Sequence, residues 1–365
     1  MSPEARLGKQ IFADESLSAS GKMSCATCHQ PEHAFSEAST HGPVEFGGAS
    51  LDVPGFRNAP SLRYLAKTPA FSLADKDGKT VPTGGFALDG RANTLAEQAR
   101  LPLLSAHEMA NGSAAEVAAK LSHAAYATEF RAVFGADIFD DAEKALTQAV
   151  LALQQFQLED TADFAPFSSK YDYYLAGKTK LSAQEERGRG LFEDPKKGNC
   201  AACHPSARSD TGEPPLFTDF TYDNLGVPRN AAIPANARRE FFDLGLCGPF
   251  RTDLAQRKEF CGAFKVPTLR NIAITAPYFH NGRFATLNEV VEFYVERDSN
   301  PGKWYSENAG KVHRFDDLPQ QYVDNVNTTE VPYDRHLGET PALDASEIED
   351  VVVFLKTLTD GYRPD

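Results

Sequence analysis

Residues 25–29 read Cys-Ala-Thr-Cys-His, and residues 200–204 read Cys-Ala-Ala-Cys-His. Both segments match the C-x-x-C-H pattern, in which two thiols bond the vinyl groups of a haem and the histidine ligates its iron. A thioredoxin-like thiol pair or a zinc site would use similar residues, but two complete copies favour two covalent c-type haems. We therefore predict thioether bonds and iron ligation by Cys25, Cys28, His29, Cys200, Cys203 and His204.

The segments that precede the two motifs are alike. Residues 7–12 read Leu-Gly-Lys-Gln-Ile-Phe, and residues 187–192 read Arg-Gly-Arg-Gly-Leu-Phe. Each predicts a short helix that places an aromatic residue ahead of the haem loop, and Ser182 with Glu185 gives the second helix a capping box. This weak internal repeat is typical of two cytochrome c-like halves.

Two further segments carry apolar residues at helical spacing. They are residues 146–156 and residues 348–358, the latter behind a predicted cap at Ser346 and Glu349. Long loops rich in glycine and proline, with little strand signal, separate the helices. These loops cover residues 40–60, 68–90 and 205–237.

Length and composition agree with two globular domains. The chain has 365 residues, of which 41% are hydrophobic, and this is enough for a buried core in each half. We predict a mostly α fold of two cytochrome c-like domains, each with one haem c, long loops and little β structure. The domains span residues 1–165 and 166–365, with the boundary between Thr161 and Ser169.

The charge balance excludes some partners. The 37 basic and 51 acidic residues give a formal charge of -14, which disfavours binding to nucleic-acid phosphates. No apolar run approaches the roughly 20 residues that span a bilayer, and the N-terminus lacks the features of a signal peptide. Because haem c is attached outside the cytoplasm, we expect a periplasmic protein whose leader has been removed.

The second axial ligand of each iron separates electron transfer from catalysis. A haem that only transfers electrons commonly has a methionine as second ligand, whereas a catalytic haem keeps one face open. The chain contains only Met1, Met23 and Met109, so none lies in the C-terminal half. The second haem must therefore take a different ligand or leave the position empty.

Tyr294 is one residue that could fill this position. It belongs to a helix predicted to begin at the capping box of Thr286 and Glu289. It shares an apolar face with Leu287, Val290 and Val291. Periodicity alone cannot make it a ligand, because most buried tyrosines are core residues or hydrogen-bonded phenols.

Five further motifs lie along nearly the whole chain. They are Gly-Phe-Arg-Asn-Ala-Pro at 55–60, Asp-Gly-Arg-Ala at 89–92, Pro102 with Glu108 and Met109, Val-Pro-Thr-Leu-Arg-Asn at 266–271, and Thr-Ala-Pro-Tyr-Phe-His-Asn-Gly at 275–282. Together they resemble the bacterial di-haem cytochrome c peroxidase and MauG family. In that family the N-terminal haem is a high-spin peroxide site and the C-terminal haem is a low-spin electron relay. The resemblance implies a peroxidase-type oxidoreductase that uses hydrogen peroxide.

The same resemblance gives Tyr294 a role. Many peroxidases of the family place the relay methionine fourteen residues after the histidine of a Pro-Tyr-Phe-His motif, and Tyr294 stands at that distance from His280. MauG has His/Tyr ligation at this haem, which agrees with the missing methionine. A phenolate ligand lowers the reduction potential and favours high-valent iron. We expect His204 and Tyr294 to ligate the second iron.

At the first haem, Glu108 and Pro102 match distal-pocket positions of the family. A carboxylate above iron can move a proton from one peroxide oxygen to the other, so Glu108 is the expected acid/base, with a solvated helix-end charge as the alternative. His41 and His107 are other candidate distal groups. We find no histidine where other peroxidases of the family close their resting haem, which suggests an open site.

The family also binds calcium between its haems. Asn58 and the backbone carbonyls of Thr275 and Pro277 would supply hard oxygen ligands suited to that ion. Arg270 and His280 would bind haem propionates, with ordinary structural hydrogen bonding as the alternative.

Three positions bear on the MauG analogy. Leu88 stands where the family has a tryptophan between the haems, and Gly198 replaces a surface tryptophan that MauG uses. MauG's own substrate is therefore not expected. The only tryptophan, Trp304, is a candidate relay of oxidising equivalents, with packing on the surface as the alternative.

Several C-terminal segments resemble the MbnH branch of the family. They are residues 247–264, residues 293–297 and the pair Trp304 and Tyr305. MbnH-type enzymes convert a tryptophan of a partner protein, MbnP, to kynurenine. In an oxidising compartment we expect a disulfide between Cys247 and Cys261, with free thiols as the alternative.

These features lead to three candidate functions. The first is an enzyme that uses hydrogen peroxide to form a high-valent, bis-Fe(IV)-type state and oxidises a tryptophan of an MbnP-like protein to kynurenine by long-range electron transfer. The second is a di-haem cytochrome c peroxidase that reduces hydrogen peroxide with electrons from a small cytochrome or cupredoxin. The third, a plain di-haem electron carrier, is disfavoured by the missing methionine and by Glu108.

Overall fold

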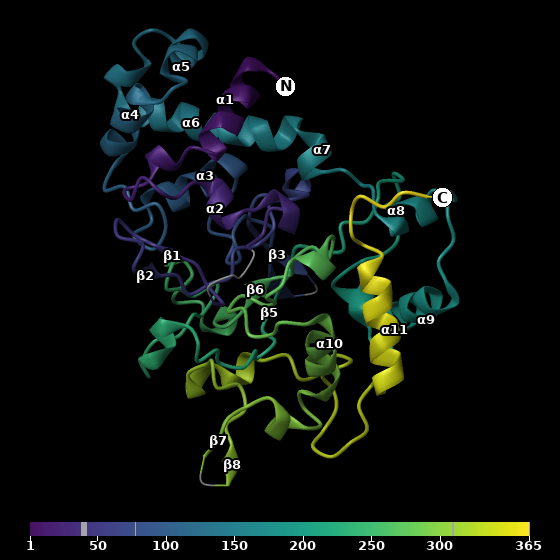
Figure 1. Cartoon of the computed structure of the whole chain (residues 1–365). Helices are drawn as coiled ribbons and strands as arrows, with labels where there is room; N and C mark the ends of the chain where they lie inside the picture. Colours follow the sequence, from purple (N-terminus) through teal and green to yellow (C-terminus); the bar gives the residue numbers. More distant parts are fainter. Residues whose placement is uncertain (38–41, 77, 309, 365) are drawn as a thin grey trace. The chain divides into compact units, whose positions relative to one another are not determined.

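The computed structural model describes residues 1–37, 42–76, 78–308 and 310–364, which form two units (Figure 1). Unit 1 contains Met1–Phe71, Gly85–Ala165 and Ile233–Ala235, and unit 2 contains Ser72–Gly84, Pro166–Ala232 and the chain from Asn236 to the C-terminus. Each unit has a hydrophobic core of its own. Helix outweighs strand in the described chain, as the sequence predicts.

Unit 1 is built mainly from helices. They are α1 (Pro3–Phe12), α2 (Cys25–Cys28), α3 (Leu95–Leu104), α4 (Ala114–His123), α5 (Ala127–Phe134), α6 (Ala142–Glu159) and α7 (Thr161–Phe164). The short strands β1 (Phe46–Gly47) and β2 (Val53–Pro54) pair antiparallel. The predicted apolar face of residues 146–156 is buried, because α6 runs through the core of the unit.

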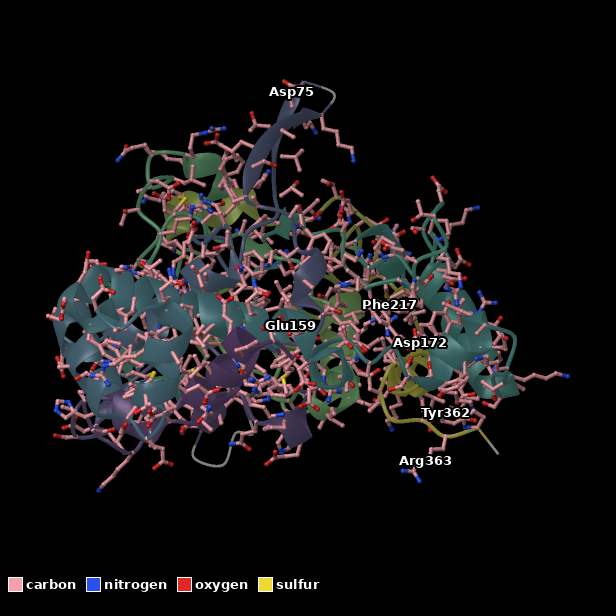
Figure 2. All side chains as sticks on the ribbon, turned by 90° about the horizontal axis from the view of Figure 1, so that it is seen from above. Asp75, Glu159, Asp172, Phe217, Tyr362 and Arg363 are labelled. Atoms are coloured by element: carbon pink, nitrogen blue, oxygen red, sulfur yellow. A yellow bond between two sulfur atoms is a disulfide. The ribbon has the colours of Figure 1, made fainter. Side chains whose placement is uncertain are left out.

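Helices α1 and α6 cross at very short range. A Cβ added at Gly8 would overlap the carbonyl oxygen of Ala152, so the two backbones touch. Ser2 caps α1, and its backbone N–H and hydroxyl also donate to the carboxylate of Glu159 on α6, which Figure 2 labels. Glycine in the repeated segment is therefore required by helix packing.

Unit 2 combines helices with small antiparallel hairpins. Its helices are α8 (Lys170–Leu175), α9 (Ala183–Glu193), α10 (Leu287–Glu296) and α11 (Ala345–Lys356). Its strands are β3 (Ser72–Lys76) with β4 (Lys79–Thr83), β5 (Tyr222–Asp223) with β6 (Phe264–Lys265), and β7 (Glu307–Asn308) with β8 (Lys311–Val312).

Short 3-10 turns occur in both units. They lie at Glu15–Leu17, Pro31–His33, Leu65–Lys67, Ile138–Asp140, Cys200–Ala202, Pro234–Ala237, Lys258–Phe260, Ile272–Ile274, Pro301–Lys303 and Gln320–Asn325.

Helices α9 and α11 repeat the crossing of α1 and α6. A Cβ at Gly188 would overlap the carbonyl oxygen of Asp350, as Gly8 would that of Ala152. The predicted capping box of Ser182 and Glu185 is confirmed. The capping box predicted for the last helix is wrong.

Asp344 and Glu347 cap α11 instead. Asp344 accepts hydrogen bonds from the backbone N–H groups of Ser346 and Glu347, both at 2.9 Å. Ser346 therefore already lies in the first turn and cannot serve as the cap.

One predicted loop contains a hairpin. Strands β3 and β4 lie within residues 68–90, where we expected a loop with little strand signal, and all five positions of β3 are exposed. Because no face of β3 is buried, its sequence lacks the alternation that indicates a strand. The hairpin belongs to unit 2 rather than to the predicted domain 1–165, since Thr83 pairs with Thr221 and the Tyr222 hydroxyl donates to the Gly84 carbonyl at 2.6 Å.

None of the helices in the described residues is long and apolar enough to cross a membrane.

Candidate functional site

The first haem motif lies on α2 and the turn that follows it. The Nδ1 atom of His29 lies 2.9 Å from the carbonyl oxygen of Phe35. This contact and a backbone hydrogen bond with Pro60 orient the ring. Burial lowers the pKa of His29 below its ordinary value, which favours the neutral imidazole that ligates iron.

A pocket opens beside this motif. Its lining brings together the predicted residues Cys25, Cys28, His29, Pro102 and Glu108. The other lining residues are Phe12, Met23, Ser24, Leu62, Gln98, Ala99, Met109, Leu153 and Gln157. Two thiols, one histidine and mostly apolar walls fit a covalently attached haem.

Gln157 supports the same interpretation. It is buried on α6, and its Oε1 atom is without a hydrogen-bond partner within the part of the chain that the structure describes. A buried polar atom of this kind requires a partner, which a bound group or water would supply. No signal in the sequence selects Gln157 or Gln98, because a glutamine on a helix usually faces solvent.

Glu108 reaches the cavity from the turn after α3. Burial raises the pKa of its carboxyl, against the hydrogen bond from Ser105 and the charge of Arg91. A buried carboxyl with a raised pKa is suited to holding and releasing a proton. Pro102 lies inside α3, and its carbonyl accepts a hydrogen bond from the backbone N–H of Met109 at 3.0 Å. The roles of Glu108 and Pro102 remain predictions.

Two histidines are alternative candidates for the distal group of the first haem. His107 has its Nδ1 atom 2.9 Å from the carbonyl oxygen of Pro54, and its ring packs edge-on against Phe56. These contacts give His107 a structural role. His41 lies outside the described residues.

The second motif repeats the first in detail. The Nδ1 atom of His204 lies 2.7 Å from the carbonyl oxygen of Phe217. Phe35 and Phe217, which hold the two histidines, both have positive φ angles, 58° and 54°. This conformation is unfavourable for a phenylalanine, so its presence in both units indicates that the carbonyl must be aimed at the histidine.

Tyr294 lies close to the second motif. The sulfur atoms of Cys200 and Cys203 act electrostatically on its phenol, although burial is the main reason that its pKa is raised. A phenolate here would need a positive partner, which ferric iron would supply. The capping box of Thr286 and Glu289 is confirmed, and α10 buries Leu287, Val291, Phe293 and Val295, while Val290 and Tyr294 are half-buried.

Tyr333 is a second phenol at this site, and sequence reasoning missed it. Its ring centre lies 5.8 Å from that of Tyr294, and Cys203 acts electrostatically on both phenols. Tyr333 lies between a 3-10 turn and α11, outside any helix or strand. No periodic pattern in the sequence could have selected it.

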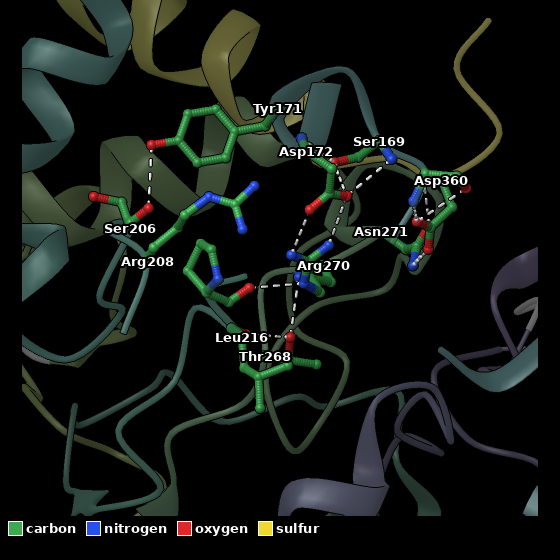
Figure 3. A network of polar contacts seen from close by, with 12 residues as sticks. Ser169, Tyr171, Asp172, Ser206, Arg208, Leu216, Thr268, Arg270, Asn271 and Asp360 are labelled. Carbon is green, nitrogen blue, oxygen red and sulfur yellow. Dashed lines mark hydrogen bonds and ion pairs between the residues drawn. The ribbon is translucent and has the colours of Figure 1, made fainter. Parts of the chain in front are cut away.

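Arg270 forms a buried ion pair with Asp172 (Figure 3). Its Nη1 and Nη2 atoms donate to the two carboxylate oxygens of Asp172 at 3.0 and 2.8 Å, and its Nε donates to the Pro215 carbonyl at 2.8 Å. Ser169 donates to the same carboxylate. Structural hydrogen bonding, the alternative for Arg270, is therefore present, and binding of a propionate remains a prediction.

The other predicted cofactor residues also have structural contacts. The ring of His280 stacks on Phe264 at 3.8 Å, and its Nε2 lies 3.8 Å from Asp317. Asn58 belongs to unit 1, and Thr275 and Pro277 belong to unit 2. The calcium site stays a prediction.

Trp304 is buried, so packing on the surface, the alternative to its relay role, is wrong. Its exposed fraction is 8%, because its ring packs edge-on against Phe284 and Phe293 at 5.7 and 5.6 Å. The indole N–H is buried and makes no hydrogen bond to the residues that the structure describes. The Nζ atom of Lys303 lies 4.7 Å from the ring centre. A relay role for Trp304 remains a prediction.

The two positions that depart from MauG differ in burial. Leu88 is half-buried. Gly198 is buried, and a Cβ there would lie 2.7 Å from the carbonyl oxygen of Leu191. This backbone cannot carry a surface tryptophan at position 198.

Cys247 and Cys261 form a disulfide, with their Cα atoms 5.0 Å apart.

Comparison with known proteins identifies the family. The family model described as di-haem cytochrome c peroxidase matches residues 2–180. MauG of Paracoccus denitrificans (strain Pd 1222) is 38% identical over 376 residues, which cover 99% of this chain and 89% of that protein. The chain belongs to the di-haem cytochrome c peroxidase and MauG family. It is therefore a peroxidase-type oxidoreductase.

Other members of this di-haem family agree. The cytochrome c551 peroxidase of Nitrosomonas europaea is 32% identical over 293 residues, covering 79% of this chain and 71% of that protein. The crystal structure of the diheme peroxidase BthA from Burkholderia thailandensis E264 has a TM-score of 0.89 at 39% identity, covering 99% of this chain and 86% of that one. A MauG-like protein associated with microbial copper homeostasis has a TM-score of 0.66 at 27% identity, covering 99% and 90%. The identity to BthA is higher, and assignment to the MbnH branch stays a prediction.

Proposed function

We propose that this protein uses hydrogen peroxide to oxidise a tryptophan of a partner protein by long-range electron transfer. The observation that supports this most is Tyr294, a phenol beside Cys200 and Cys203 in a half of the chain without methionine. The family implies two haems, which would store two oxidising equivalents. A phenolate ligand favours that storage, because it stabilises oxidised iron.

Glu108 would handle the protons at the first haem. Its carboxyl lines the same cavity as His29 and the two thiols of that motif. Peroxide bound there would give a proton from its near oxygen to Glu108 and receive it on its far oxygen, which leaves as water. Pro102 and the apolar lining would limit the entry of water.

At the second haem, His204 and Tyr294 would be the axial ligands. From Tyr294 an aromatic path leads to Trp304, since the ring centre of Phe293 lies 6.4 Å from Tyr294 and 5.6 Å from Trp304. Trp304 would relay electrons along this path. These short ring separations are the support for that role.

The remaining assignments follow from the family. Arg270 and His280 would contact haem propionates, and Asn58, Thr275 and Pro277 would hold a calcium ion through oxygen ligands. The first haem would be high-spin and open, and the second low-spin. Attachment of haem c would place the protein in the periplasm.

An MbnP-like protein is the proposed substrate, and kynurenine the proposed product. Two peroxide molecules would take up the four electrons and four protons that the tryptophan loses, and would leave as four water molecules. Two water molecules at the tryptophan would supply the oxygen atoms of N-formylkynurenine, and hydrolysis would then release formate. The similarity to a protein associated with copper homeostasis supports a partner of this class.

The second candidate function is peroxide reduction with electrons from a small cytochrome or cupredoxin. The similarity to the cytochrome c551 peroxidase of Nitrosomonas europaea favours it. Tyr294 argues against it, because a haem with a low potential accepts electrons from such donors poorly.

Adding one equivalent of hydrogen peroxide to the ferric protein, and following its spectrum with and without a reduced cytochrome, distinguishes these functions. We expect the ferric protein to develop a long-lived oxidised spectrum that a reduced cytochrome does not quench rapidly. Rapid oxidation of the cytochrome would instead establish the second candidate, and an unchanged spectrum would rule out both.

Mass spectrometry then tests the substrate. An MbnP-like protein is incubated with the enzyme and peroxide, and its tryptophan peptides are compared with those from peroxide alone. Oxygen-containing tryptophan products are expected only with the enzyme. Their absence would refute the proposed substrate class.

A further inference from the structure

Buried phenols of unit 2 usually donate their proton to a backbone carbonyl. The hydroxyl of Tyr171 donates to Ser206 at 3.1 Å, that of Tyr278 to Ile272 at 2.9 Å, and that of Tyr305 to Gly226 at 2.7 Å. This is the expected pattern, because a buried hydroxyl without a partner is costly.

Tyr333 and its half-buried neighbour Tyr294 break this pattern. Among residues 166–308 and 310–364, and in the rest of the described chain, neither hydroxyl has a hydrogen bond, and neither oxygen is one of the fully buried polar atoms without a partner. Tyr333 is nevertheless only 8% exposed. The two rings lie 5.8 Å apart with an interplanar angle of 33°, so the unpartnered phenols are neighbours.

Arg297 holds the ring of Tyr333 in place. This arginine is fully buried, and its Cζ atom lies 4.6 Å from the centre of the Tyr333 ring. Its guanidinium is itself fixed, because it donates to the carbonyls of Leu225 and Asn327 and to the carboxylate of Asp298. A cation over an aromatic face withdraws electron density from the ring, which makes the phenol a better hydrogen-bond donor.

We propose that Tyr333 is a positioning residue that donates a hydrogen bond to the phenolate oxygen of Tyr294. The inference rests on the proposed ligation of iron by Tyr294. An anionic oxygen is a strong acceptor, so this bond would be charge-assisted. It would orient the ligand and reduce the electron density that the phenolate gives to iron, as contacts to metal ligands generally do.

The test compares Tyr333→Phe with the parent protein, both in the ferric holoprotein form. Phenylalanine keeps the ring under Arg297 and removes only the hydroxyl. We expect the phenolate-to-iron charge-transfer band to shift and the reduction potential of the second haem to fall. In deuterated water, the phenolate bands in resonance Raman spectra should shift for the parent and stay in place for the variant.

Tyr305→Phe is the matched control. It also removes a buried phenol of unit 2, but one whose proton is given to Gly226. We expect neither the charge-transfer band nor the potential to change in Tyr305→Phe.

Tyr294→Phe separates this inference from the proposed function. If Tyr294→Phe leaves the second haem unchanged, the ligation fails and the inference fails with it. If Tyr294→Phe abolishes the charge-transfer band while Tyr333→Phe behaves like Tyr305→Phe, only the inference is overturned. If the band is lost in Tyr333→Phe and kept in Tyr294→Phe, Tyr333 is the ligand and both proposals are wrong.

Discussion

At the scale of single residues, a backbone carbonyl fixes each histidine of the haem motifs. The carbonyls belong to Phe35 and Phe217, and both residues adopt the left-handed conformation to present them. Such strain costs about 1–3 kcal/mol per residue. It persists where the surrounding packing supports it, and here it orients the atom that would ligate iron.

The proposed role of Glu108 leads to a kinetic prediction. Glu108→Gln keeps the size of the side chain but cannot accept the peroxide proton, so the reaction with peroxide should slow by about 10²–10⁴-fold. Stopped-flow spectra of the ferric protein mixed with peroxide measure this rate. Glu97→Gln, an exposed change at the start of α3, should leave it unaltered. Equal rates for Glu108→Gln and the parent would remove Glu108 from the mechanism.

Glu37 should make stability depend on pH. Its side chain is 1% exposed, and burial raises its pKa from 4.5 to about 7, with a contribution from Glu45. The folded state therefore binds this proton more tightly than the unfolded chain, so the contribution to stability is largest below pH 4.5 and is lost as the pH rises to about 7. At about 1.36 kcal/mol per pH unit, the loss amounts to about 3 kcal/mol.

Glu37→Gln removes this titration and keeps an oxygen to accept from the N–H of Ala59. The free energy of unfolding, measured by denaturant titration at several pH values, should therefore favour the variant increasingly between pH 4.5 and 7. Above that range the difference should be constant. A difference that does not vary with pH would show that Glu37 is charged throughout.

At the scale of helices, close crossings define the core of each unit. Gly8 lets α1 touch α6, and Gly188 lets α9 touch α11, at equivalent places in the repeated segment. In each unit, the helix ahead of the haem motif thus packs on a long helix that comes later in the chain. The haem motif follows the first helix of each pair along the chain.

The crossing of α9 and α11 predicts opposite effects for two glycines of one helix. Gly188→Ala places a methyl group against the carbonyl of Asp350 and should destabilise the protein by about 1–3 kcal/mol. Gly190→Ala, two residues along, has open space around its Cβ and should be neutral or stabilising by up to about 1 kcal/mol, since alanine is the better helix former. Thermal unfolding of both variants provides the comparison. Similar effects at the two positions would argue against the close crossing.

At the scale of the whole molecule, the two units repeat one plan. Each has a crossed helix pair, a C-x-x-C-H segment and a phenylalanine carbonyl on the motif histidine. The units differ in one covalent feature, since the disulfide of Cys247 and Cys261 belongs to unit 2. The family membership and the two motifs imply two haems in one chain.

Haem content tests this plan directly. Replacing Cys25 and Cys28 together by alanine should leave one covalent haem per polypeptide, and so should replacing Cys200 and Cys203. The pyridine haemochrome spectrum, normalised to protein mass, gives the count. A parent protein with a single haem would contradict the division of function between the units.

The sequence by itself determined the haem motifs, the mostly α fold, the family and the helix that carries Tyr294. These follow from local signals, namely fixed spacings, capping boxes and apolar periodicity, which depend on neighbours along the chain. Only the tertiary structure decided that Trp304 is buried, that α11 begins at Asp344, that the hairpin of β3 and β4 belongs to unit 2, and that Gln157 and Tyr333 reach the sites. These depend on contacts between residues far apart in the chain, and an exposed strand, a lone tyrosine or a glutamine carries no local pattern that reveals such contacts.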